Sequence, residues 1–135
     1  NYIYIAAGES DLDYMDNVYD CQIGIQLTRQ MLMATPEVTA IVCMNDMMAL
    51  GSISQLQDQG YNVPEDYSIV GFDDAFFANL IRPRITTVRF EKYNIGRLAM
   101  RMLNDIIRGK QPIKHHDLSS YTHLIIRESS GKPRE

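Results

Sequence analysis

Two pairs of oxygen-rich residues each follow an apolar segment of this 135-residue chain. They are Asn45 and Asp46, after residues 39–44, and Asp73 and Asp74, after residues 67–72. Adjacent carboxylates are costly to bury, so they must face water, a ligand or a compensating dipole. Side chains of this kind bind ligand hydroxyls, hold Mg²⁺, accept a phosphoryl group or cap a helix.

Helix capping suits the second residue of each pair. A carboxylate between a strand and a helix satisfies free N–H groups at the helix N-terminus, and we expect this structural role for Asp46 and Asp74. Asn45 and Asp73, one residue earlier, would then face a ligand and hydrogen-bond its hydroxyl groups.

The residues that usually accompany catalysis are missing from the sequence. It contains no glycine-rich phosphate loop of the P-loop or dinucleotide type and no GxSxG serine. His115 and His116 have no acid or cysteine at ligand spacing, which predicts a solvated pair rather than a metal site. We therefore expect a binding protein without a cofactor or a metal, and not an enzyme.

The elements that must position these residues alternate along the chain. Apolar runs with β-rich composition predict strands over residues 2–7, 39–44, 67–72, 85–90 and 123–127. Helical spacing of apolar residues predicts helices over 18–34, 47–59 and 94–108, with a short one over 75–80. This order is typical of an α/β fold with a parallel sheet flanked by helices on both faces.

Composition limits the function classes further. The chain is 45% hydrophobic and 22% charged, as expected for one globular domain. A net charge of -4 without a basic cluster argues against nucleic-acid or acidic-membrane binding by this segment. No apolar run reaches the length of a membrane span. Cys21 and Cys43 are predicted to be reduced and buried, with a disulfide as the alternative.

Linked motifs carry a resemblance to a known family. They are Asn45 to Gly51 (NDMMALG), Val63 to Asp66 (VPED), Val70 to Asp74 (VGFDD), Thr86 to Val88 (TTV) after Pro83, and Leu124 to Ser130 (LIIRESS). At this spacing they closely resemble the effector-binding core of LacI/GalR bacterial transcriptional regulators. The resemblance implies that residues 1–135 form the C-terminal part of a type I periplasmic-binding-protein-like domain.

The resemblance also implies which residues contact the effector. Asn45 and Asp73 match positions that hydrogen-bond a small molecule, often a sugar, in a cleft between two subdomains. Phe90 would line that cleft, with a plain core phenylalanine as the alternative. Counting back from Gly24, Tyr19 best fits the aromatic that stacks on the effector, and Tyr14 is second.

The family pattern further implies partners. A homodimer would form through Leu50, Phe77, Leu80 and Ile81, although packing of these side chains onto the chain's own sheet is the alternative. We expect operator DNA to be bound only by a helix-turn-helix headpiece outside this chain. The family implies a cytoplasmic protein without membrane contact, and a periplasmic sugar-binding protein of a transport system is the alternative.

A first subdomain outside this chain would cover the third long helix. Residues 85–92 are expected to form the crossover, and the helix over 93–108 is expected to pack on that subdomain. Ile95, Leu98, Met102 and Ile106 would otherwise leave an apolar stripe uncovered. In this chain alone we expect the helix to fold back over its own sheet or to dock against a second copy.

Overall fold

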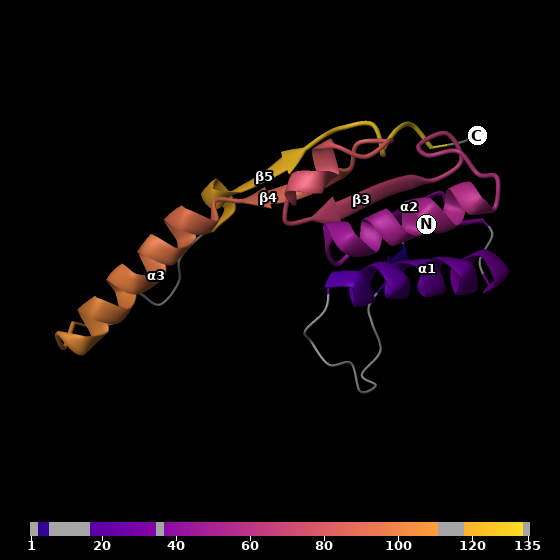
Figure 1. Cartoon of the computed structure of the whole chain (residues 1–135). Helices are drawn as coiled ribbons and strands as arrows, with labels where there is room; N and C mark the ends of the chain where they lie inside the picture. The colour runs from indigo at the N-terminus through magenta and orange to yellow at the C-terminus, as the bar shows by residue number, and fades with distance from the viewer. Residues whose placement is uncertain (1–2, 6–16, 35–36, 111–117, 134–135) are drawn as a thin grey trace.

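The computed structural model of the protein describes residues 3–5, 17–34, 37–110 and 118–133. Strands and helices alternate as predicted (Figure 1). In chain order they are β1 (Ile3–Ile5), α1 (Asn17–Ala34), β2 (Ala40–Cys43), α2 (Asp46–Asp58), β3 (Ser68–Phe72), the 3₁₀ helix η1 (Phe76–Asn79), β4 (Thr86–Phe90), α3 (Lys92–Ile107), the 3₁₀ helix η2 (Ser119–Tyr121) and β5 (Thr122–Ile125). Only η2 has no counterpart in the sequence prediction.

The strands form one sheet in the order β1-β2-β3-β4-β5. Neighbouring strands from β1 to β4 pair in parallel, as expected. The pair β4 and β5 is antiparallel, with Val88 opposite Leu124, so the sheet is mixed. The chain leaves the end of β4 through α3 and returns from that same end, which reverses the direction of β5 (Figure 1).

Helices cover one face of the sheet in the described part of the chain, and the prediction of two covered faces is wrong there. α2 packs against β2 and β3, and α1 packs against α2 (Figure 1). Ile41 and Cys43 face this layer and are buried, while Val42 between them is 36% exposed. Right-handed connections between strands that are neighbours in sequence and in the sheet place successive helices on the same side.

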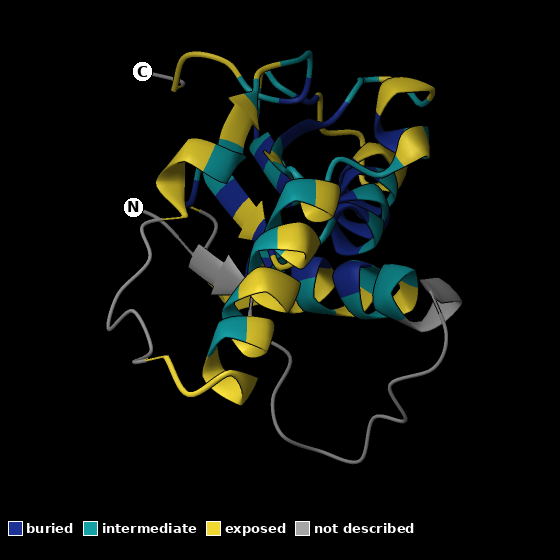
Figure 2. Ribbon diagram, turned by 90° about the vertical axis from the view of Figure 1, so that its left-hand side faces the viewer, coloured by how far each residue is buried: buried dark blue, intermediate teal, exposed yellow. Residues whose placement is uncertain are grey.

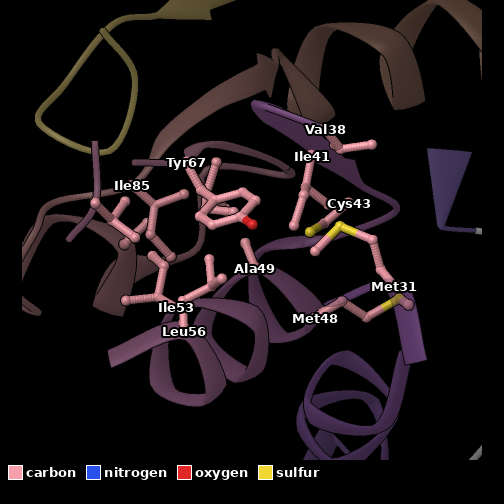
Figure 3. Packing of buried hydrophobic residues seen from close by; sticks show 13 residues of the cluster. Met31, Val38, Ile41, Cys43, Met48, Ala49, Ile53, Leu56, Tyr67 and Ile85 are labelled. Carbon is pink, nitrogen blue, oxygen red and sulfur yellow. The ribbon is translucent and has the colours of Figure 1, made fainter. Parts of the chain in front are cut away.

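The core lies between α2 and the sheet (Figure 3). Met48, Ile53 and Leu56 line the inner face of α2, and Ile41 and Ile69 face them from β2 and β3; all five are at most 2% exposed. Burying each such side chain contributes about 1.5 to 3 kcal/mol. This layer fixes where β2 and β3 end, and therefore where Asn45 and Asp73 lie.

Two glycines allow α1 and α2 to pack closely. A Cβ atom on Gly24 would meet the Met48 carbonyl, and a Cβ atom on Gly51 would meet the Cys21 carbonyl. The backbones are therefore too close for any side chain at either position.

Cys21 and Cys43 are both free thiols, and burial raises the pKa of Cys43 to about 11, so this thiol stays protonated.

α3 projects away from the sheet and has no buried residue (Figures 1 and 2). Tyr93, Met100 and Ile107 are 83%, 66% and 75% exposed. The expectation that this helix folds back over its own sheet is therefore wrong. Chain direction explains the result, because β4 passes beyond the helical layer before α3 begins. Docking against a second copy stays a prediction.

Candidate functional site

The carboxyl ends of parallel strands meet at one edge of a sheet, where ligands of open α/β proteins bind. Asn45 lies two residues after β2, Asp73 directly follows β3, and Phe90 ends β4. These strands are neighbours, so three of the four predicted effector contacts share this edge. Tyr19 belongs to the first turn of α1, and its side chain lies outside the described residues, as does all of Tyr14.

Phe90 packs against an aromatic side chain of the adjacent strand. The rings of Phe72 and Phe90 are 4.7 Å apart between centroids and nearly perpendicular. Both residues are half-buried. Such an edge-to-face pair fixes the direction of the Phe90 ring and leaves part of its surface uncovered.

The turn after β3 has an uncommon backbone conformation. Asp73 and Asp74 have φ angles of 98° and 50°, in the region that side chains other than glycine rarely adopt. The Asp73 N–H donates to the carbonyl of Val88 on β4 at 2.9 Å. Backbone strain of this kind costs about 1 to 3 kcal/mol per residue and persists only where neighbouring contacts enforce it.

Asp74 supplies some of those contacts through two ion pairs. Arg89 Nε of β4 and Arg127 Nη2 each donate to its carboxylate at 2.6 Å, and the Asp74 side chain is only 10% exposed. Burial would raise the pKa of Asp74, but the hydrogen bonds and charges of Arg127 and Arg89 outweigh burial and lower it. The predicted capping role is wrong, because the N-cap of η1 is Ala75 and no side chain caps it.

Asp46 holds the same turn from the other side. Its carboxylate accepts from the Thr87 hydroxyl and from the Ala75 N–H, both at 2.6 Å, and the residue is 1% exposed. A Cβ atom on Gly71 would meet this carboxylate, so only glycine leaves room for it. Burial raises the pKa of Asp46, the two hydrogen bonds oppose that rise, and the negative charge of Asp74 adds to it. Asp46 therefore ties α2 to β4 and to the β3 turn.

Asn45, rather than Asp46, is the N-cap of α2, which corrects the predicted role of Asp46. The Asn45 side-chain oxygen accepts from the Met48 N–H at 2.9 Å, and its backbone is extended, as N-cap residues require. Its amide nitrogen donates to Asp20 Oδ2 of α1 at 2.7 Å. Asn45 therefore has a structural role that sequence reasoning assigned to its neighbour.

Asp73 keeps the most accessible carboxylate of the two motifs. Its side chain is 47% exposed, and its one ion pair among the described residues is a 3.9 Å approach of Lys92 Nζ. A carboxylate in this state accepts hydrogen bonds from ligand hydroxyl or amino groups. The geometry therefore suits binding of a polar molecule at this edge.

Sequence reasoning missed Asp20, Thr87, Arg89 and Arg127. Each reaches the site from another part of the chain: Asp20 precedes Asn45 by 25 positions, and Arg127 follows Asp74 by 53 positions. Thr87 belongs to the TTV motif, which was the one signal in the sequence that could have identified any of the four.

Within the described residues no His, Cys, Asp and Glu side chains gather as a metal-binding group, and His115 and His116 lie outside those residues.

The residues predicted to form a dimer interface differ in exposure. Leu50, Phe77 and Ile81 pack against the core of their own chain. Leu80 is 66% exposed, and Phe76 nearby on η1 is 84% exposed.

Among the described helices, none combines the length and apolar character that crossing a membrane requires.

Comparison with known protein families and sequences gives matches over most of the chain. The family model of the periplasmic binding protein-like domain matches residues 4–130. The HTH-type transcriptional repressor PurR of Mannheimia succiniciproducens is 32% identical over 114 residues, which are 84% of this chain and 34% of PurR. The repressor CytR of Escherichia coli K12 is 37% identical over 107 residues, 79% of this chain and 29% of CytR. The chain thus spans about a third of the length of these relatives.

Solved structures of similar fold are regulators as well. A LacI family regulator from Bifidobacterium animalis superposes with a TM-score of 0.75 at 30% identity, covering 86% of this chain and 42% of that protein. The regulator CelR, in complex with cellobiose, gives 0.73 at 34% identity over 82% of this chain and 33% of CelR. A LacI family regulator from Arthrobacter, in complex with lactose, gives 0.67 at 26% identity over 82% of this chain and 42% of that regulator.

Proposed function

Because this chain belongs to the periplasmic binding protein-like domain family, in the form found in LacI/GalR regulators, we propose that it senses the effector of a bacterial transcriptional regulator. The complete protein would bind its operator through a helix-turn-helix segment, as the names of PurR and CytR indicate for those relatives. The net charge of -4 fits a DNA-binding segment that is separate from this one, because an acidic surface repels the phosphates of DNA.

The effector is proposed to be a carbohydrate that binds at the edge formed by β2, β3 and β4. One observation carries this assignment: Asp73 is held in a left-handed turn with its carboxylate 47% exposed, directly beyond a parallel strand. Asn45 and Phe90 would complete the contact from the adjacent strands, and Tyr19 from α1. Regulators of similar fold hold cellobiose and lactose, which supports a sugar.

Binding without chemistry is the proposed activity. The relatives are regulators rather than transport proteins or enzymes, and this favours a cytoplasmic regulator over a periplasmic carrier. A mobility-shift assay of the complete protein with DNA from upstream of its own gene tests the proposal. Cellobiose or lactose is expected to change the amount of shifted DNA. A secretory signal peptide in place of a helix-turn-helix segment would contradict it.

Homodimer formation is proposed to use Leu80 together with Phe76. These two side chains are exposed, whereas Leu50, Phe77 and Ile81 serve the core of their own chain. Leu80→Asp is therefore expected to shift the complete protein from dimer to monomer in sedimentation without unfolding it. A dimer that persists would argue against this surface. Ile81→Asp is the less informative change, because it also disturbs the core.

The helix α3 is proposed to pack on a first subdomain of the complete protein, with residues 85–92 as the crossover. None of its apolar residues is buried within the described chain, and such side chains gain about 1.5 to 3 kcal/mol each on full burial. Hydrogen exchange of the complete protein should show protected amides in α3. Amides that exchange as fast as in an isolated peptide would contradict this packing.

A further inference from the structure

Asp20 lies beside Asn45, although neither composition nor motif spacing points to it. It occupies the first turn of α1, and its Oδ2 accepts the hydrogen bond from Asn45 Nδ2 at 2.7 Å. The close packing of α1 on α2 at Gly24 and Gly51 brings the two side chains together. Both are only partly buried, so the pair reaches the surface at the end of β2.

The hydrogen-bonding capacity of this pair is only partly used. Asn45 has two N–H donors on its amide nitrogen; Asp20 takes one, and the Met48 N–H occupies the amide oxygen. Among the described residues, one amide N–H of Asn45 therefore has no acceptor. Within the described residues no hydrogen bond reaches the second carboxylate oxygen of Asp20. The pair presents one donor and one charged acceptor side by side.

A hydroxyl group matches that arrangement, because it donates one hydrogen bond and accepts others. A phosphate or carboxylate group only accepts, and the charge of Asp20 would repel it. Of the cations described at this edge, Arg89 and Arg127 are engaged by Asp74. Lys92 lies 3.9 Å from the Asp73 carboxylate, which balances its charge there. Among the described residues no cation forms an ion pair with Asp20, so none at this pair would compensate an anionic group of a ligand.

We propose that Asp20 is a further effector-contacting residue, and that Asp20 and Asn45 together bind one hydroxyl group of an uncharged polyhydroxylated effector. The inference rests on the proposed function and favours neutral sugars over sugar phosphates at this strand edge. Asp73 accepts from a second hydroxyl group at the neighbouring strand end. Asp20 thus selects the ligand, and it also holds the orientation of the Asn45 amide.

Calorimetric titration of the complete regulator tests this with cellobiose, lactose, glucose, galactose, glucose 6-phosphate and galactose 6-phosphate as probes. Binding of at least one neutral sugar, and of neither phosphate, is expected. Asp20→Ala should weaken the binding of that sugar by about 10- to 100-fold, the effect of losing a hydrogen bond to a charged group. Asp20→Asn should weaken it less, because an amide oxygen still accepts from Asn45.

Asp58→Ala is the matched control, since Asp58 is an exposed acid at the opposite end of α2. It should bind the sugar like the wild type, and all three variants should unfold at similar temperatures. Equal affinity of wild type and Asp20→Ala would overturn the role of Asp20 and leave the proposed function standing. Binding of a phosphate ester in preference to its neutral sugar would overturn the ligand class. If the wild type bound none of the neutral sugars, the proposed function and this inference would fall together.

Discussion

The turns after β2 and β3 carry similar residue pairs, yet the chain uses the two pairs differently. After β2, Asp46 is 1% exposed and Asn45 is hydrogen-bonded on both sides within the chain. After β3, Asp74 is clamped by two arginines, while the Asp73 side chain stays 47% exposed. The second residue of each pair therefore holds the turns in place, and of the three carboxylates in the two pairs Asp73 alone stays accessible.

The largest effect on stability is expected at Asp46. Asp46→Ala removes the acceptor of the buried Thr87 hydroxyl and of the partly buried Ala75 N–H. We expect a loss of about 2 to 4 kcal/mol in the free energy of unfolding. Urea denaturation measures it, with Asp58→Ala as the control. A loss no larger than that of the control would show that Asp46 does not tie the two turns together.

A somewhat smaller loss is expected at Asp74. Asp74→Ala leaves Arg127, with a side chain only 13% exposed, without its carboxylate, while Arg89 is half exposed and well solvated. The expected loss is about 1 to 3 kcal/mol, because removing one partner of a partly buried pair leaves a charge uncompensated. Thermal unfolding measures it. If the variant were as stable as the wild type, the clamp would have no structural role.

The two structural acids, Asp46 and Asp74, should respond to pH with opposite signs. The folded-state pKa of Asp74 is lowered, so its stabilising contribution is complete above the unfolded value of about 3.9 and is lost as pH falls through the folded pKa. The pKa of Asp46 is raised, so its contribution decreases as pH rises from about 3.9 through the folded pKa.

Unfolding free energies measured from pH 7 downward test these signs. Relative to the wild type, Asp74→Asn should lose less stability on acidification below about pH 4. As pH falls from 7 toward about 4, protonation of Asp46 should raise the free energy of unfolding of the wild type. Asp46→Asn should lack this increase. Parallel curves for the wild type and both variants would contradict the assignment of these pKa shifts.

The smallest of the structural effects belongs to Asn45. Asn45→Ala removes the N-cap of α2 and is expected to cost about 1 kcal/mol. Asn45→Ser is the matched variant, because a serine hydroxyl caps the helix but cannot reproduce the amide donor to Asp20. Serine should therefore restore most of the stability. Equal losses for both variants would mean that the contact with Asp20, rather than the cap, dominates.

Much of the fold could be predicted from sequence because its signals are local. Apolar spacing and strand composition identified α2 and β3 within a few residues, and Gly60, with a φ of 82°, ends α2 as expected. The direction of β5 and the single helical layer could not be predicted in this way. Both depend on which strands are neighbours and on where α3 leaves the sheet. The local spacing of apolar residues contains no information about either.

The candidate site was predictable in position but not in division of roles. The order of strands alone placed Asn45 and Asp73 at one edge. Which acid caps, clamps or stays open depends on long-range partners such as Thr87, Arg127 and Asp20. The capping roles assigned to Asp46 and Asp74 were wrong for that reason. An acid next to a strand end is compatible with several roles, and its contacts in the folded chain decide which of them it has.

Titration of the complete regulator with its neutral sugar, comparing the wild type and Asp73→Ala, shows whether the Asp73 carboxylate binds the effector. In the described part of the chain Asp73 has no ion pair closer than the 3.9 Å approach of Lys92, so the variant should keep its unfolding temperature. Its affinity for the sugar should fall by about 10- to 100-fold, because the exposed carboxylate accepts a hydrogen bond from the ligand. Unchanged affinity with unchanged stability would rule out the effector role of Asp73, since this residue would then contribute neither to the fold nor to the site.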